Sequence, residues 1–224
     1  MTNAVYKSET SKIFSIIITK LVLSILLAIL FVFSCYSGGS IIRRLDIDIP
    51  LLSIIMSIAF TVLDVVMYIG FFRLSRDMAG TRDGGSFSLL KVSALMGIIA
   101  SAMSWLAFIP VKRDLAEFIP ILCGLINLCS FILSLIAYGQ LSKSVTFPGA
   151  RGAKKCFIAL LLNLVLILDL GVLAALLILP GTDYFRYGAF VVLFFLFSLG
   201  LSSLILYIIG WVQIKNAPLP DNEL

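Results

Sequence analysis

Six long runs of apolar residues fill most of this chain and limit its fold more than any other feature. A bilayer has a hydrocarbon core about 30 Å thick, which a helix of about 20 apolar residues crosses. The runs lack the period-two alternation of half-buried strands, and an open sheet edge cannot face lipid. They predict an all-α integral membrane protein, a six-transmembrane-helix bundle that forms one domain over residues 1–224. The predicted spans are residues 13–36, 51–72, 88–109, 115–141, 156–179 and 185–214.

The composition excludes a water-soluble fold. Of the 224 residues, 61% are hydrophobic and 13% are charged, and the mean hydropathy is +1.13. Soluble domains are about 45–50% apolar and about 25% charged. Only short loops remain outside the six runs, so any chemistry must lie among the helices or on those loops.

The basic residues indicate the orientation of the chain in the membrane. With six spans, eleven Lys and Arg residues fall on the side of the termini and five on the other side. Basic residues concentrate in cytoplasmic loops, so both termini are expected in the cytoplasm, with a bacterial inner membrane as the expected location. The eleven are Lys7, Lys12, Arg73, Arg76, Arg82, Lys91, Lys143, Arg151, Lys154, Lys155 and Lys215.

The net charge of +5 does not indicate a nucleic-acid partner, because the basic residues are spread over several loops without a dense run. The cytoplasmic loops 73–86 and 143–155 carry Gly and basic residues but no Gly-Lys-Ser/Thr word of a phosphate-binding loop. We expect them to contact anionic lipid headgroups, with docking of an acidic protein partner as the second option.

The first apolar run has a rival interpretation. Lys7, Lys12 and Lys20 precede an apolar stretch that ends at Cys35, which resembles a lipoprotein signal. Phe33 is a bulky residue where such a signal has a small or β-branched one. The interpretation as a membrane span is therefore preferred.

Similar words at three helix ends indicate an internal repeat. Each word runs from an aromatic residue through Gly to a polar or basic stop, and the words are residues 68–76, 138–143 and 207–215. The fifth span also opens like the first: Lys155 lies eight residues before Asn163, and Lys12 eight residues before Lys20. These similarities predict three antiparallel helical hairpins. The alternative is convergence, because every cytoplasmic helix end needs aromatic and basic anchors.

Polar side chains within the spans are the candidate functional residues, because each is expensive in hydrocarbon unless it is paired or hydrated. The candidates are Lys20, Asp64, Asn127, Asn163 and Asp169. Asp169 is either a proton or cation site that lines a cavity, or a neutral buried carboxyl that is hydrogen-bonded to a neighbouring helix.

Lys20 and Asp64 are predicted to form an ion pair between the first two spans. In an antiparallel hairpin the two residues lie at nearly the same depth. Unpaired, each charge would carry its own penalty of insertion into the bilayer. The alternative is that Lys20 reaches the headgroups alone along its flexible stem.

No catalytic residues, cofactor or metal site are predicted. The chain has no histidine, and its four cysteines form no CxxC pair. Small residues at four-residue spacing, Ser93, Gly97 and Ser101, indicate close helix packing rather than a ligand path.

These features favour a protein that is not an enzyme. The leading hypothesis is an accessory, scaffold or sensor subunit that acts through helix packing with a protein partner or a second copy. The alternative is a transporter or channel for a small solute or ion that uses the intramembrane carboxylates.

Overall fold

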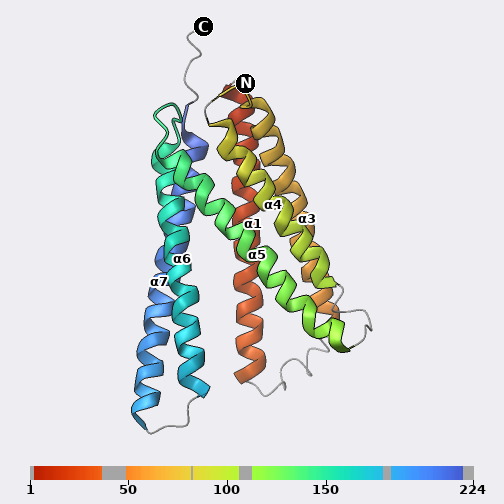
Figure 1. The fold of residues 1–224 in the computed structure, drawn as a ribbon, viewed down its shortest axis with the longest axis vertical. Helices are drawn as coiled ribbons and strands as arrows, with labels where there is room; N and C mark the ends of the chain where they lie inside the picture. The colour runs from red at the N-terminus through yellow and green to blue at the C-terminus, as the bar shows by residue number, and fades with distance from the viewer. Residues whose placement is uncertain (1–2, 37–48, 82, 106–112, 179–182, 219–224) are drawn as a thin grey trace. The chain divides into compact units, whose positions relative to one another are not determined.

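The computed structural model describes residues 3–36, 49–81, 83–105, 113–178 and 183–218 (Figure 1). Among these residues it does not describe the side chains of residues 3–4, 27–36, 49–54, 56, 104, 113–117, 170–178 and 183–197. All regular structure in the described part is helical. The helices are α1 (Asn3–Tyr36), α3 (Ile49–Asp77), α4 (Gly84–Ser104), α5 (Arg113–Ser142), α6 (Ala150–Ile178) and α7 (Asp183–Asn216).

Each predicted apolar run overlaps one helix, so the expected helical class is confirmed for the described residues. Four segments are long and apolar enough to cross a membrane: Ser57–Asp77, Gly84–Met103, Phe118–Ser142 and Ser198–Asn216. The predicted spans 13–36 and 156–179 fall partly on side chains outside the description. The count of six spans therefore stays a prediction.

Several helices are longer than the apolar runs that predicted them. α1 begins at Asn3 instead of Ile13, and α3 ends at Asp77 instead of Phe72. Tyr6, Thr10 and Ile13 are fully buried at helical spacing, so the extra turns of α1 pack against protein. The apolar runs marked only the most hydrophobic part of each helix, because amphipathic turns beyond it carry charged residues on their other face.

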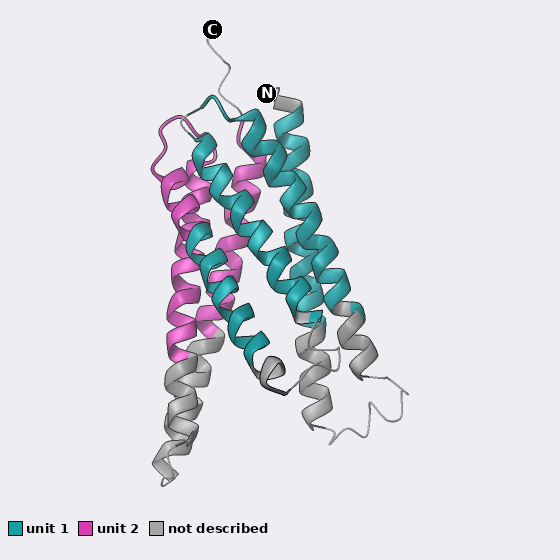
Figure 2. Ribbon diagram, turned by 45° about the vertical axis from the view of Figure 1, so that its right-hand side comes forward, with its two compact units in different colours: residues 1–134 teal, residues 135–224 magenta. Residues whose placement is uncertain are grey.

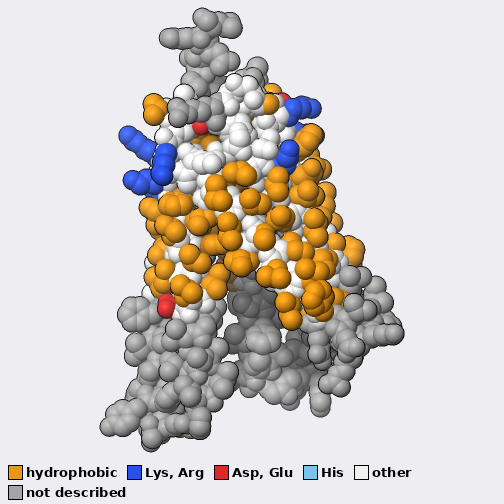
Figure 3. Space-filling view, viewed as in Figure 1, with side chains coloured by type: hydrophobic (Ala, Val, Ile, Leu, Met, Phe, Trp, Pro, Cys, Tyr) orange, Lys and Arg blue, Asp and Glu red, His pale blue; other side chains and the backbone are white. Residues whose placement is uncertain are grey.

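The described chain forms two compact units (Figure 2), and each has its own packing. In unit 1, residues 1–134, α1 packs against α3 and α3 against α4. In unit 2, residues 135–224, α6 packs along α7. On the face drawn in Figure 3, hydrophobic side chains cover the helix surfaces, and Lys and Arg side chains lie toward one end of the helices. Exposed apolar residues such as Val62, Leu125 and Leu168 are the surface expected of helices that contact lipid.

Two glycines bring α6 and α7 into backbone contact. A Cβ at Gly152 would lie 2.4 Å from the carbonyl oxygen of Gly210, and a Cβ at Gly210 would lie 2.6 Å from Sγ of Cys156. Close approach at small residues is how helices gain packing energy in a bilayer, where water supplies no hydrophobic driving force between them. Beside this contact, Trp211 packs edge-on against Tyr138, and both side chains are buried.

Substitution of either glycine by alanine is expected to destabilise unit 2. The new methyl group would meet backbone or a buried thiol, and overpacking of this kind costs about 1–3 kcal/mol. Gly200→Ala is the matched control on α7, since its Cβ would meet only Cδ1 of Leu166 at 3.9 Å. In mild detergent, the midpoint temperature of thermal unfolding should be lower for Gly152→Ala and Gly210→Ala than for Gly200→Ala. Equal transitions for all three variants would contradict the proposed contact.

Candidate functional site

Three helices of unit 1 meet at the carboxylate of Asp64. Lys20 on α1 forms an ion pair and hydrogen bond with Oδ1 of Asp64. Ser101 on α4 donates a hydrogen bond of 3.2 Å to Oδ2. The exposed fraction is 7% for the side chain of Asp64 and 27% for that of Lys20. Both carboxylate oxygens are therefore satisfied by side chains from neighbouring helices.

The predicted pair of Lys20 and Asp64 is thus confirmed. Because α1 and α3 extend beyond the apolar runs, both residues lie near the middle of their helices. The ammonium group of Lys20 meets the carboxylate there, so the alternative in which Lys20 reaches the headgroups alone is not what the structure adopts.

The small-residue stripe of α4 helps to place this carboxylate. A Cβ at Gly97 would lie 3.7 Å from Oδ1 of Asp64, and Ser101 lies one turn further on the same face. Ser93, one turn before Gly97, contacts α5 instead: its hydroxyl lies 2.9 Å from the hydroxyl of Ser130 and 2.7 Å from that of Ser134. The predicted packing role of Ser93, Gly97 and Ser101 is confirmed.

A second polar cluster lies where the buried face of α1 begins, and sequence reasoning missed it. The carboxylate of Glu9 contacts Nζ of Lys12 at 2.9 Å and a guanidinium nitrogen of Arg73 at 3.1 Å. Burial raises the pKa of Glu9, but the hydrogen bonds and charges of Lys12 and Arg73 outweigh it and hold the pKa below its usual value. The helical spacing of Tyr6, Thr10 and Ile13 was the sequence signal that this segment packs against protein.

The remaining candidates differ in their surroundings. Asn163 is paired: its side-chain oxygen accepts a hydrogen bond of 2.9 Å from Ser203 of α7, within unit 2. The side chain of Asn127 is exposed on α5 and has no hydrogen-bond partner among the described residues. Asp169 is half-buried and borders residues 170–197, whose side chains lie outside the description.

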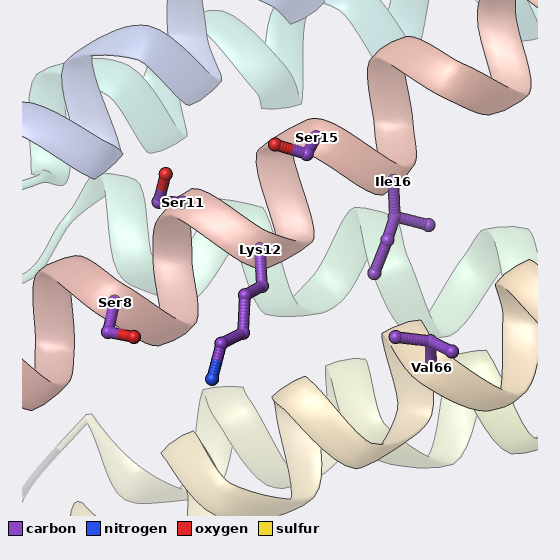
Figure 4. Close-up of a pocket in the computed structure, with 6 residues that line it drawn as sticks. All are labelled: Ser8, Ser11, Lys12, Ser15, Ile16 and Val66. Carbon is purple, nitrogen blue, oxygen red and sulfur yellow. The ribbon is translucent and has the colours of Figure 1, made fainter.

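Within the described residues, no group of three potential ligand side chains is placed to hold a metal ion. A groove on α1 and α3 is lined by Ser8, Ser11, Lys12, Ser15, Ile16 and Val66 (Figure 4). The polar contacts described above are ion pairs and side-chain hydrogen bonds between helices. Chemically, such groups neutralise charge and fix helix rotation.

No family model, curated protein or solved structure matches this chain.

Removal of either member of the Lys20–Asp64 pair is expected to destabilise unit 1. Lys20→Leu and Asp64→Leu each leave one charge without its partner in an apolar setting, a loss on the order of 3 kcal/mol. The double variant removes both charges and should recover much of that loss. Thermal unfolding of the four proteins in mild detergent completes a double-mutant cycle. Strictly additive losses would mean that the two charges act independently.

The Glu9 cluster predicts loss of stability in acid. Because the folded protein holds the pKa of Glu9 below its ordinary value of 4.5, the carboxylate stabilises the fold above that pH. This contribution falls as the pH drops through the lower, folded pKa. Between about pH 6 and pH 3, the free energy of unfolding should fall less steeply with decreasing pH for Glu9→Gln than for the unmodified protein. Parallel pH profiles would contradict an ionised Glu9 in the fold.

Proposed function

We propose that this protein is a non-catalytic subunit of the membrane, an accessory, scaffold or sensor protein that acts through helix packing with a partner. One observation carries the proposal. The side chain of Asn127 is exposed on α5, within Phe118–Ser142, a segment long and apolar enough to cross a membrane. An amide facing hydrocarbon loses its hydrogen bonds to water, so a partner helix that supplies new ones is favoured.

Three other candidate residues of the spans support the same proposal. Lys20 and Asp64 neutralise each other, and Asn163 is hydrogen-bonded to Ser203. Such pairing consumes polar groups inside the bundle and leaves them unavailable to a solute. Asn127 is the contrasting case, because nothing among the described residues satisfies its amide.

A second copy of this chain suits the α5 face. An asparagine amide carries both donors and an acceptor, so it pairs with an identical amide across a twofold axis. Gly124 lies one turn before Asn127, and a Cβ there would meet nothing within 4 Å. A second backbone has room to approach at that point.

The proposed setting is the one that the charge distribution favours. The protein crosses the membrane six times with both termini in the cytoplasm of a bacterium, and its basic loops contact anionic lipid headgroups.

We also propose that the hairpin of α1 with α3 and the hairpin of α6 with α7 are copies of one structural repeat. Gly70 faces Ile13 in unit 1, where a Cβ would lie 2.7 Å from Cγ1, and Gly210 faces Cys156 in unit 2. The aligned positions Lys12 and Lys155 directly precede Ile13 and Cys156.

The polar contacts of the two hairpins keep the same register. Lys20 and Asn163 follow Ile13 and Cys156 by seven residues each. Their partners, Asp64 and Ser203, lie about two turns before the glycines Gly70 and Gly210 on the returning helices. Independent selection of aromatic and basic anchors at helix ends does not require the two polar contacts to share a register. The shared register therefore supports an internal repeat.

A second candidate function is transport of a proton or small cation. It is favoured by Asp64, a carboxylate near the middle of α3 that both Lys20 and Ser101 contact. In this alternative, protonation of Asp64 releases Lys20 during a transport cycle. Uptake of protons or cations by vesicles that contain the purified protein, abolished by Asp64→Asn, would favour transport over the packing role.

Association through α5 is expected to depend on Asn127. In vesicles at high dilution, photobleaching of a labelled protein should count two copies for the unmodified chain and for Asn127→Gln, which keeps the amide. Asn127→Leu should yield mainly single copies. An interhelical amide contact in a membrane contributes about 0.6–2 kcal/mol, which corresponds to a three- to thirty-fold weaker association.

The matched control for this experiment is Leu125→Ala. Leu125 is exposed on α5 and lies about 160° around the helix from Asn127. This variant should associate like the unmodified protein. Single copies for the unmodified chain, with no membrane protein retained through purification, would contradict the proposed packing role.

A further inference from the structure

A groove crosses the boundary between the polar and apolar parts of α1. It has a volume of about 460 Å³ and is lined by Ser8, Ser11, Lys12, Ser15, Ile16 and Val66. The five α1 residues lie on one helical face, at spacings of three and four. Figure 4 shows Ser11 and Ser15 along one side of that face and Lys12 and Ile16 along the side next to α3, where Val66 lies.

The lining changes from polar to apolar along the helix. Ser8, Ser11 and Lys12 precede the apolar run that begins at Ile13, whereas Ile16 lies within it. Val66 belongs to Ser57–Asp77, a segment long and apolar enough to cross a membrane. A ligand of this groove therefore meets hydroxyl groups and an ammonium group at one end and aliphatic side chains at the other.

The polar end of the groove is cationic. The side chain of Lys12 is 53% exposed, whereas that of Glu9, its partner, is 7% exposed. Arg73 also contacts Glu9, so two cations share one carboxylate and the cluster keeps a charge of +1. The carboxylate of Glu9 positions Nζ of Lys12, and the ammonium group of Lys12 keeps further N–H donors for an anion.

The serine hydroxyls add further donors. Ser8, Ser11 and Ser15 have no side-chain hydrogen-bond partner in the part of the chain that the structure describes. Each hydroxyl group supplies one donor and two acceptor sites. Three hydroxyl groups and an ammonium group can donate hydrogen bonds to the oxygens of a phosphodiester and of the neighbouring ester groups.

We propose that this groove is a binding site for an anionic glycerophospholipid. Lys12, Ser8 and Ser11 hold the phosphodiester, Ser15 lies at the level of the glycerol esters, and Ile16 and Val66 contact the first part of an acyl chain. A phospholipid is the ligand class that joins an anion to an apolar chain at this depth. The site lies on α1 and α3 within unit 1, and none of its six lining residues belongs to the basic loops or to α5.

Lipid retention by the purified full-length protein tests the proposal. The protein in mild detergent is mixed with phosphatidylglycerol or with phosphatidylcholine of the same acyl chains, and bound lipid is counted by native mass spectrometry. Retention of phosphatidylglycerol should exceed that of phosphatidylcholine. One lysine near an anionic headgroup is worth about fivefold in affinity, so Lys12→Gln should lower phosphatidylglycerol retention by about that factor.

Two further variants keep the test decisive. Ser8→Ala combined with Ser11→Ala leaves the Glu9–Lys12 contact intact and should also weaken phosphatidylglycerol binding. Lys7→Gln is the matched control, because Lys7 is exposed on the same helix and does not line the groove. It should bind lipid like the unmodified protein.

Other outcomes would overturn the proposal. Equal losses for Lys7→Gln and Lys12→Gln would mean diffuse electrostatic attraction rather than a site. Unchanged binding in Lys12→Gln and in the serine double variant would exclude the groove. Inorganic phosphate that competes fully with phosphatidylglycerol would indicate a site for a soluble anion. An acidic peptide that displaces the lipid while phosphate does not would indicate a protein ligand.

Discussion

A carboxylate and an ammonium group inside apolar helices must neutralise each other, and the arrangement of α1, α3 and α4 depends on this requirement. Asp64 receives Lys20 from one side and Ser101 from the other. Each contact removes part of the penalty that a charge carries in hydrocarbon. Because hydrogen bonds are directional, the same contacts fix how each helix is rotated about its own axis. Dispersion forces between exchangeable aliphatic side chains discriminate less between rotations.

Glycine contacts then set how closely the helices approach. Gly70 admits Ile13 in unit 1, and Gly152 and Gly210 bring two backbones together in unit 2. A polar contact lies about two turns from Gly70 and another about two turns from Gly210: Lys20 with Asp64, and Asn163 with Ser203. Each hairpin thus combines one close approach with one polar contact. The first supplies packing energy, and the second defines rotation and depth.

The need of polar groups for partners in an apolar setting also explains why we propose ligands for two surfaces of unit 1. The amide of Asn127 faces outward on α5 without an internal partner in the described chain, so its hydrogen bonds must come from outside. The groove beside Lys12 joins cationic and aliphatic surface at the depth where the apolar run begins. A partner helix satisfies the first surface and a phospholipid the second. Both proposals follow from polar groups that have no internal partner among the described residues, in contrast to the Lys20–Asp64 and Asn163–Ser203 pairs.

The sequence by itself determined the helical class, the approximate position of each helix, and the pairing of Lys20 with Asp64. Apolar length and charge depth are properties of the chain alone, and opposite charges at one depth have few other partners. Only the tertiary structure decided that Asn163 contacts Ser203, that Glu9 joins Lys12 to Arg73, and that Asn127 faces outward. These outcomes depend on helix rotation, and an almost uniformly apolar helix carries little periodic signal of which face a neighbour covers. Serine hydroxyls give no charge pattern to read, so their partners appear only when the helices are packed.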